Sequence, residues 1–182
     1  MGHHKLSVLG IAGILAALAA AQAQEQKMEV PKPGPAHERL EFFVGNWQTE
    51  AEVKPGPGGA GGKATAAERC SWMEGGEFFV LCHGEATGPM GKLYSFGVMG
   101  YDTAAKTYTQ TWYHHDGASA NQVGSVNGKT WVFTSESTVG GRPRKRRTTF
   151  VETSPSSYTF KHESSQDGEA WVTGVEGTVT KK

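Results

Sequence analysis

The chain has 182 residues, with 18 basic and 18 acidic side chains and therefore no formal net charge at pH 7. This balance argues against a nucleic-acid-binding protein and against one that binds acidic membrane surfaces, because such partners select for a strong excess of lysine and arginine. The length is enough for one domain with its own hydrophobic core.

The N-terminal residues have the pattern of a secretory signal peptide. After Lys5, the segment Leu6–Ala21 holds apolar or small residues without a charge, and Ala21-Gln22-Ala23 is a small-x-small cleavage sequence. The uncharged run is shorter than the roughly 20 residues of a membrane-spanning helix, which disfavours an uncleaved anchor. We therefore expect residues 1–23 to be removed, leaving a periplasmic or secreted protein with no membrane association.

A polar lead and one short helix are expected next. Residues 24–35 contain several prolines and form a flexible N-terminal lead. Residues 36–44 place Leu40 and Phe43 on one face at helical spacing, and Gly45 ends the helical pattern. The helix therefore begins the folded domain, which extends over residues 36–182.

From Trp47 onward the sequence has the all-β pattern, in which short β-rich runs alternate with turn residues at intervals of roughly 8–12 residues. Glycine-containing turns such as Gly75-Gly76 and Asn127-Gly128 supply the positive φ angles of tight hairpins. Strands joined so tightly pair with their sequence neighbours, and a long meander exposes its edges unless it closes. The sequence predicts an antiparallel up-and-down β-barrel of about eight to ten strands. The expected strands begin at Trp47, Thr65, Glu77, Leu93, Lys106, Ala118, Lys129, Pro143, Ser156 and Glu169.

The two cysteines predict a structural disulfide. Cys70 and Cys82 are equally distant in sequence from Gly76, so a hairpin centred there places them directly opposite each other. An exported protein meets the oxidising conditions that such a bond requires. The alternative, a reactive thiol pair, lacks the Cys-x-x-Cys spacing of redox proteins.

Several sequence strings resemble known barrels. The string Phe42-Phe43-Val44-Gly45-Asn46-Trp47 resembles the start of calycin barrels, which include lipocalins, fatty-acid-binding proteins and nitrobindin-like haem barrels. From Pro31 to Lys182 the chain resembles the bacterial family called domain of unknown function 1579. This resemblance implies a calycin-like barrel and no settled activity. The matching strings begin at Pro33, Cys70, Gly88, Met99 and Ser157.

Two histidines are candidates for the barrel interior. His114 shares a strand face with Trp112, and His162 shares one with Tyr158 and Phe160. Each could contact a ligand or serve as the single axial ligand of a haem. A histidine whose ring nitrogens simply hydrogen-bond within the protein is the commoner case. Nitrobindin-like barrels carry their haem histidine near the C-terminus, which weakens the haem hypothesis because the last expected strand contains no histidine.

A basic run, Arg142–Arg147, has two interpretations. Phe150 suggests that its own face, which includes Arg146, turns into the barrel, where an arginine would bind a ligand carboxylate. The commoner arrangement is a solvated, charge-protected edge strand or hairpin end.

No nucleophile elbow, catalytic triad or zinc motif is present, so binding ranks above catalysis, although the fold class admits enzymes. The sequence predicts an exported protein that binds a small, partly apolar molecule, with an anionic end, inside the barrel. It predicts no metal, no nucleic-acid partner and no cofactor other than the haem of the first alternative. The alternatives are a haem-binding or enzymatic barrel using His114 or His162, and a structural or protein-interaction module with a filled core. The candidate ligand contacts are Trp47, Trp72, Trp112, His114, Trp131, Arg146, Tyr158, Phe160 and His162.

Overall fold

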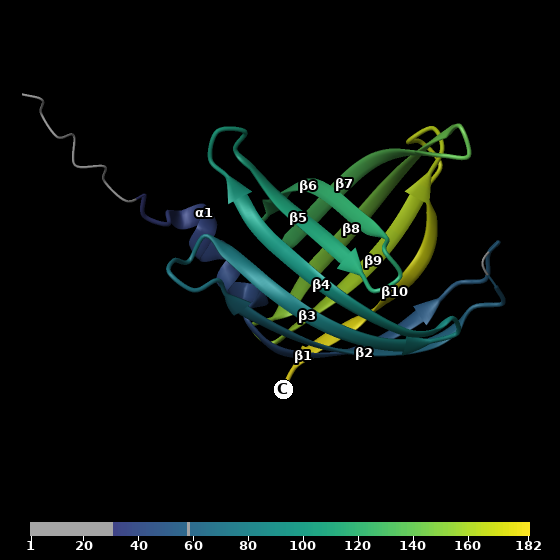
Figure 1. Ribbon diagram of the computed structural model, residues 1–182, viewed down its shortest axis with the longest axis horizontal. Helices are drawn as coiled ribbons and strands as arrows, with labels where there is room; N and C mark the ends of the chain where they lie inside the picture. Colours follow the sequence, from purple (N-terminus) through teal and green to yellow (C-terminus); the bar gives the residue numbers. More distant parts are fainter. Residues whose placement is uncertain (1–30, 58) are drawn as a thin grey trace, which may run out of the picture. The chain divides into compact units, whose positions relative to one another are not determined.

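Ten antiparallel strands close into a barrel in the computed structural model, which describes residues 31–57 and 59–182 (Figure 1). Each strand pairs with its sequence neighbours, and β1 also pairs with β10, which closes the barrel. The expected fold is therefore confirmed, and every strand begins within three residues of its predicted start. The elements are α1 Pro35–Glu38, the 3-10 helix η1 Arg39–Phe43, β1 Gly45–Val53, β2 Gly62–Trp72, β3 Phe79–Gly88, β4 Gly91–Asp102, β5 Thr107–His114, β6 Ser119–Asn127, β7 Thr130–Val139, β8 Arg142–Ser154, β9 Ser157–Ser165 and β10 Val172–Lys181.

The N-terminal helix differs from its prediction. Instead of one α-helix over residues 36–44, a single α-helical turn is followed by the 3-10 helix η1. Side chains three residues apart are aligned in a 3-10 helix, so Leu40 and Phe43 both enter the core. Arg39 holds η1 to the barrel through an ion pair with Glu152. Packing against the barrel, not helix propensity, thus decides the local conformation.

The core fills the end of the barrel beside η1. Trp47 and Trp131 begin their strands at this end and are almost completely buried. Their indole nitrogens donate hydrogen bonds to the Phe43 carbonyl oxygen at 2.7 Å and to the Glu152 carboxylate at 2.6 Å. These bonds satisfy the polar atoms of buried aromatic rings. We call this end the closed end, and the opposite end, where the turns after the odd-numbered strands lie, the open end.

The barrel wall separates on one side of the open end. The ladder between β6 and β7 runs only from Val123–Asn127 to Thr130–Thr134. Beyond it, β6 remains paired with β5, and the β7–β8 hairpin extends past the end of its ladder with β6 (Figure 1).

The part of the chain that the structure describes contains no helix long and apolar enough to cross a membrane. The expected signal peptide over residues 1–23, and most of the expected lead over residues 24–35, lie outside the described residues.

Candidate functional site

A cavity of about 550 Å³ occupies the open half of the barrel. Inward-facing residues of seven strands line it. Some of these residues lie beside the turns of the open end, which places the cavity at that end. His114 is the last residue of β5, and Arg144 lies near the start of β8. The volume lies in the range of sites that enclose small molecules. The lining residues are Thr49, Ala66, Glu68, Gln110, Trp112, His114, Ala120, Gln122, Arg144, Arg146, Arg147, Thr148, Phe150, Tyr158, Phe160, His162, Glu163, Ser164, Gly174 and Val179.

Aromatic side chains form one wall of the cavity. Phe150 on β8 is directly opposite Phe160 on β9, and Tyr158 packs edge-on against Phe150 with ring centroids 5.6 Å apart. Trp112 on β5 lies over Gly97 of β4, where a side chain would collide with the indole. This wall favours an apolar ligand body, because contact with it removes apolar surface from water.

Arginines line the mouth of the cavity. Arg144 and Arg146 face inward from β8, on the same face as Phe150, and both are exposed to solvent at the open end. Within the described residues neither forms an ion pair, whereas Lys145 and Arg147 pair with Glu136 at 3.4 Å and Glu163 at 2.8 Å.

The basic run is therefore not an edge strand. From Lys145 onward β8 is paired on both sides, because the barrel is closed. The alternative of a charge-protected edge is wrong. The alternative of a solvated hairpin end fits Arg142 and Arg144, where β8 pairs only with β7. The cavity mouth therefore carries two guanidinium groups, those of Arg144 and Arg146, that form no ion pair with the described residues.

A hydrogen-bonded polar layer lies between the aromatic core and the mouth. The amide nitrogen of Gln110 donates to the amide oxygen of Gln122 at 2.6 Å. The Thr148 hydroxyl lies 3.1 Å from the same oxygen and 2.9 Å from Nδ1 of His162. The Trp112 indole nitrogen donates to the Gln110 amide oxygen at 3.4 Å. Four strands thus contribute to one hydrogen-bonded network. Its hydrogen bonds offset the free-energy cost of burying these polar side chains.

The two interior histidines have different surroundings. Burial inside the barrel lowers the pKa of His162 to about 4, so its ring is neutral at neutral pH. The ring nevertheless has an exposed face, because it borders the lumen rather than the packed core. Nδ1 of His114 is buried and has no hydrogen-bond partner among the described residues. An unpaired acceptor is less costly than an unpaired N–H donor for His114, so its proton is best placed on Nε2.

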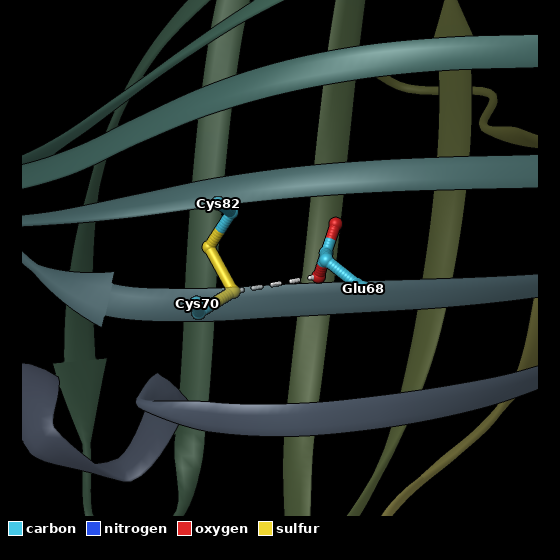
Figure 2. Close-up of side chains that lie close together, drawn as sticks. All are labelled: Glu68, Cys70 and Cys82. Carbon is cyan, nitrogen blue, oxygen red and sulfur yellow. Dashed lines mark hydrogen bonds between the residues drawn. A yellow bond between two sulfur atoms is a disulfide. The ribbon is translucent and has the colours of Figure 1, made fainter.

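Glu68 lies on the cavity wall beside the disulfide (Figure 2). Cys70 and Cys82 are directly opposite on β2 and β3 and form the predicted disulfide, with Cα atoms 4.1 Å apart. Burial raises the pKa of Glu68 to about 7, and its carboxyl group lies 3.8 Å from Sγ of Cys70. A disulfide sulfur carries no hydrogen, so only the protonated carboxyl group can donate across this contact.

Glu68, Cys70 and Cys82 together have the donor atoms of a metal site, all within 4.8 Å of one another. Metal binding by cysteine requires thiolates, and both sulfurs are bonded to each other instead. This cluster is therefore a structural disulfide with a neighbouring carboxyl group.

The structure brings six of the nine predicted contact residues to the cavity: Trp112, His114, Arg146, Tyr158, Phe160 and His162. The other three do not line it. Trp47 and Trp131 lie in the core at the closed end, and the Trp72 indole nitrogen donates to Glu41 at 2.6 Å. Strand alternation places these side chains on the inner face, but it carries no information on depth along the barrel.

Sequence reasoning missed the polar side chains of the cavity wall. Gln110, Gln122 and Thr148 are buried and share strand faces with inward aromatic residues. Glu68 faces inward two residues before Cys70. The signal was available, because a polar residue at an inward position of an alternating strand requires a partner inside the barrel.

Comparisons with known proteins concern the fold. A family model described as "Protein of unknown function (DUF1579)" matches residues 32–181. Rv2717c from M. tuberculosis is similar at a TM-score of 0.58 and 12% identity, over 82% of this chain and 98% of that chain. The S-type phycobiliprotein lyase CPES from Guillardia theta is similar at a TM-score of 0.56 and 11% identity, over 81% and 92% of the two chains. No curated protein matches the chain. The expected calycin-like barrel is confirmed, and these identities carry no information on ligands.

Proposed function

The chain belongs to the DUF1579 family, and from this premise we propose that it binds a small, partly apolar molecule with an anionic end inside the barrel. A structural neighbour is named a phycobiliprotein lyase, which is compatible with a barrel that handles small ligands. At 11% identity, however, the ligand class must rest on the residues of this cavity.

The observation that carries the proposal is the cavity, with its aromatic wall and with two arginines that form no ion pair within the described part of the chain. Phe150 and Phe160 offer apolar contact, while Arg144 and Arg146 lie nearer the solvent. A guanidinium group binds carboxylate or phosphate through two parallel hydrogen bonds. A ligand would therefore enter with its apolar end first and leave its anionic end at the mouth.

The cavity also bears on the alternatives. A cavity of about 550 Å³ disfavours the alternative of an interaction module, because that alternative expects a filled core. A haem-binding or enzymatic barrel remains a second candidate, favoured by one observation. His162, whose ring is neutral, lines the cavity, and among the described residues only its Nδ1 atom takes part in a hydrogen bond.

Export is part of the proposal. The disulfide between Cys70 and Cys82 is compatible with an oxidising compartment, in agreement with the signal-peptide pattern of residues 1–23. The mass of the denatured protein, purified from its own compartment, tests both points. Cleavage after Ala23 and a deficit of two hydrogens are expected, and an intact N-terminus would contradict export by this route.

Binding is tested in two steps. Native mass spectrometry of the same material should show a mass above the denatured value, which gives the mass of a retained ligand. A titration with the anionic aromatic dye 8-anilinonaphthalene-1-sulfonate then tests the mouth. Arg146→Gln should weaken dye binding about tenfold, the value of one charged hydrogen-bonded contact. Lys145→Gln is the matched control, because Lys145 lies next along β8 and pairs outward with Glu136. Equal affinities of both variants would contradict the proposal.

A further inference from the structure

The direction of each hydrogen bond in the polar layer follows from one fixed donor. The Trp112 indole can only donate, so the Gln110 side chain presents its oxygen to Trp112 and its nitrogen to Gln122. The Gln122 oxygen thus accepts from Gln110 and, at 3.1 Å, also from the Thr148 hydroxyl. A reversed Gln122 amide would leave two amide nitrogens facing each other at 2.6 Å, which no hydrogen-bond pattern supports.

The single proton of Thr148 then determines the tautomer of His162. Because that proton goes to Gln122, the Thr148 oxygen is an acceptor toward Nδ1 of His162, 2.9 Å away. Nδ1 must therefore carry the ring proton, and Nε2 keeps its lone pair. Nε2 makes no hydrogen bond to the described residues, and His162 lines the cavity and is exposed to solvent.

Resting on the function proposed above, we propose that Nε2 of His162 accepts a hydrogen bond from the ligand and selects hydroxylated amphipathic acids over their non-hydroxylated counterparts. The barrel register sets the spacing of the two ligand groups. Thr148 is directly opposite His162, and Arg146 lies two residues nearer the mouth on β8. Two residues of strand correspond to about 7 Å. The ligand hydroxyl therefore lies about 7 Å or more inward from the anionic group. It lies on the side of the cavity that is formed by β8 and β9, which also carry Phe150 and Phe160.

Selectivity follows from the cost of an unpaired acceptor. A ligand without a hydrogen-bond donor displaces water from Nε2 and leaves this acceptor unpaired, whereas a ligand hydroxyl donates a hydrogen bond to it. The difference corresponds to about tenfold in affinity. A site that pairs with a ligand hydroxyl discriminates by this means much better than an apolar pocket does.

The test compares three rigid probes by isothermal titration calorimetry: 2-naphthoate, 6-hydroxy-2-naphthoate and 3-hydroxy-2-naphthoate. The 6-hydroxyl lies at the far end from the carboxylate, whereas the 3-hydroxyl lies beside it and cannot reach His162 when the carboxylate is at the mouth. The wild-type protein should bind the 6-hydroxy acid about tenfold more tightly than the other two.

Two variants of Thr148 test the tautomer. Thr148→Val removes the oxygen that holds the Nδ1 proton, so the preference for the 6-hydroxy acid should shrink. Thr148→Ser keeps that oxygen and should keep the preference. His162→Phe should abolish the preference while 2-naphthoate still binds.

The outcomes separate the two proposals. If all three probes bind equally to the wild type, or if His162→Phe keeps the preference, the selectivity proposal is overturned and cavity binding stands. If none of the probes binds, both proposals fall. A Soret band on addition of hemin, lost in His162→Phe, would assign the Nε2 lone pair to iron and overturn the selectivity proposal.

Discussion

Replacing Glu68 by glutamine should stabilise the protein at alkaline pH and leave it unchanged in acid. Glu68 faces the barrel interior beside the disulfide, and within the described residues no lysine or arginine pairs with it. Burial raises the pKa of its carboxyl group from 4.5 to about 7. Glutamine has the same size but cannot ionise, so it removes only the cost of burying the charge.

The sign and magnitude follow from proton linkage. Between pH 4.5 and 7 the unfolded chain has lost the Glu68 proton while the folded barrel retains it, so the free energy of unfolding falls as pH rises. Above pH 7 the full difference is lost, about 3 kcal/mol at 1.36 kcal/mol per pKa unit. This figure is an upper bound, because one side of the carboxyl group borders the lumen, where water lessens the cost of ionisation.

Guanidinium chloride unfolding at pH 4, 6 and 8 measures this effect. Glu68→Gln and the wild type should have equal stability at pH 4, and the variant should gain up to about 3 kcal/mol by pH 8. Glu50→Gln, on the exposed face of β1, controls for loss of a surface carboxylate. If the difference in unfolding free energy between Glu68→Gln and the wild type is the same at pH 4, 6 and 8, a neutral, buried Glu68 is refuted.

Three further predictions concern the barrel. Replacing both Cys70 and Cys82 by alanine should cost about 3 kcal/mol of unfolding free energy, the chain-entropy value for a loop of this length, measured by urea denaturation; an unchanged midpoint would contradict it. Gly97→Ala should reduce dye affinity, because the new Cβ would lie 2.6 Å from the Trp112 ring and displace it into the cavity; Gly56→Ala, at an open position without a positive φ, would control for loss of a glycine. The folded pKa of His162 is lowered to about 4, so its contribution to stability is present above pH 6.5 and is lost as pH falls toward 4. His162→Phe should therefore lose less stability than the wild type between pH 7 and 4, and an identical loss in the two proteins would exclude this role.

Local pattern predicted the architecture because hairpin barrels are built from local rules. A glycine pair with positive φ at Gly140 and Gly141 makes the β7–β8 turn. The β6–β7 turn is made by Gly128, which has a positive φ, and Lys129, one residue later than the expected Asn127-Gly128 pair. Since each hairpin is symmetric about its turn, the Cys70–Cys82 register followed from Gly76 alone. The cavity wall includes Trp112, His162 and Phe150, which agrees with the inward face that alternation allowed for each of them.

The depth of each side chain along the barrel could not be predicted in this way. Trp47 and Trp112 both face inward, yet one lies in the core beneath η1 and the other lines the cavity. Their difference depends on where η1 packs, which is a tertiary contact. The same holds for Thr148 in the polar network: Gln110 and Gln122 are directly opposite on the β5–β6 hairpin, but Thr148 lies on β8, which pairs with neither strand.

The polar layer explains why the barrel keeps an open half. A barrel selected only for stability would continue the aromatic core of Trp131 and Phe133 toward the open end, because apolar packing is the least costly way to fill it. Instead, Gln110 and Gln122 end that core, and a buried amide pair does not stabilise more than an apolar pair of the same shape. Beyond the layer, the two guanidinium groups of Arg144 and Arg146 lie unpaired among the described residues, which adds repulsion without a compensating contact. The function proposed above would account for these features: the apolar body of the ligand would contact Phe150 and Phe160, and its anionic end would pair with the two guanidinium groups.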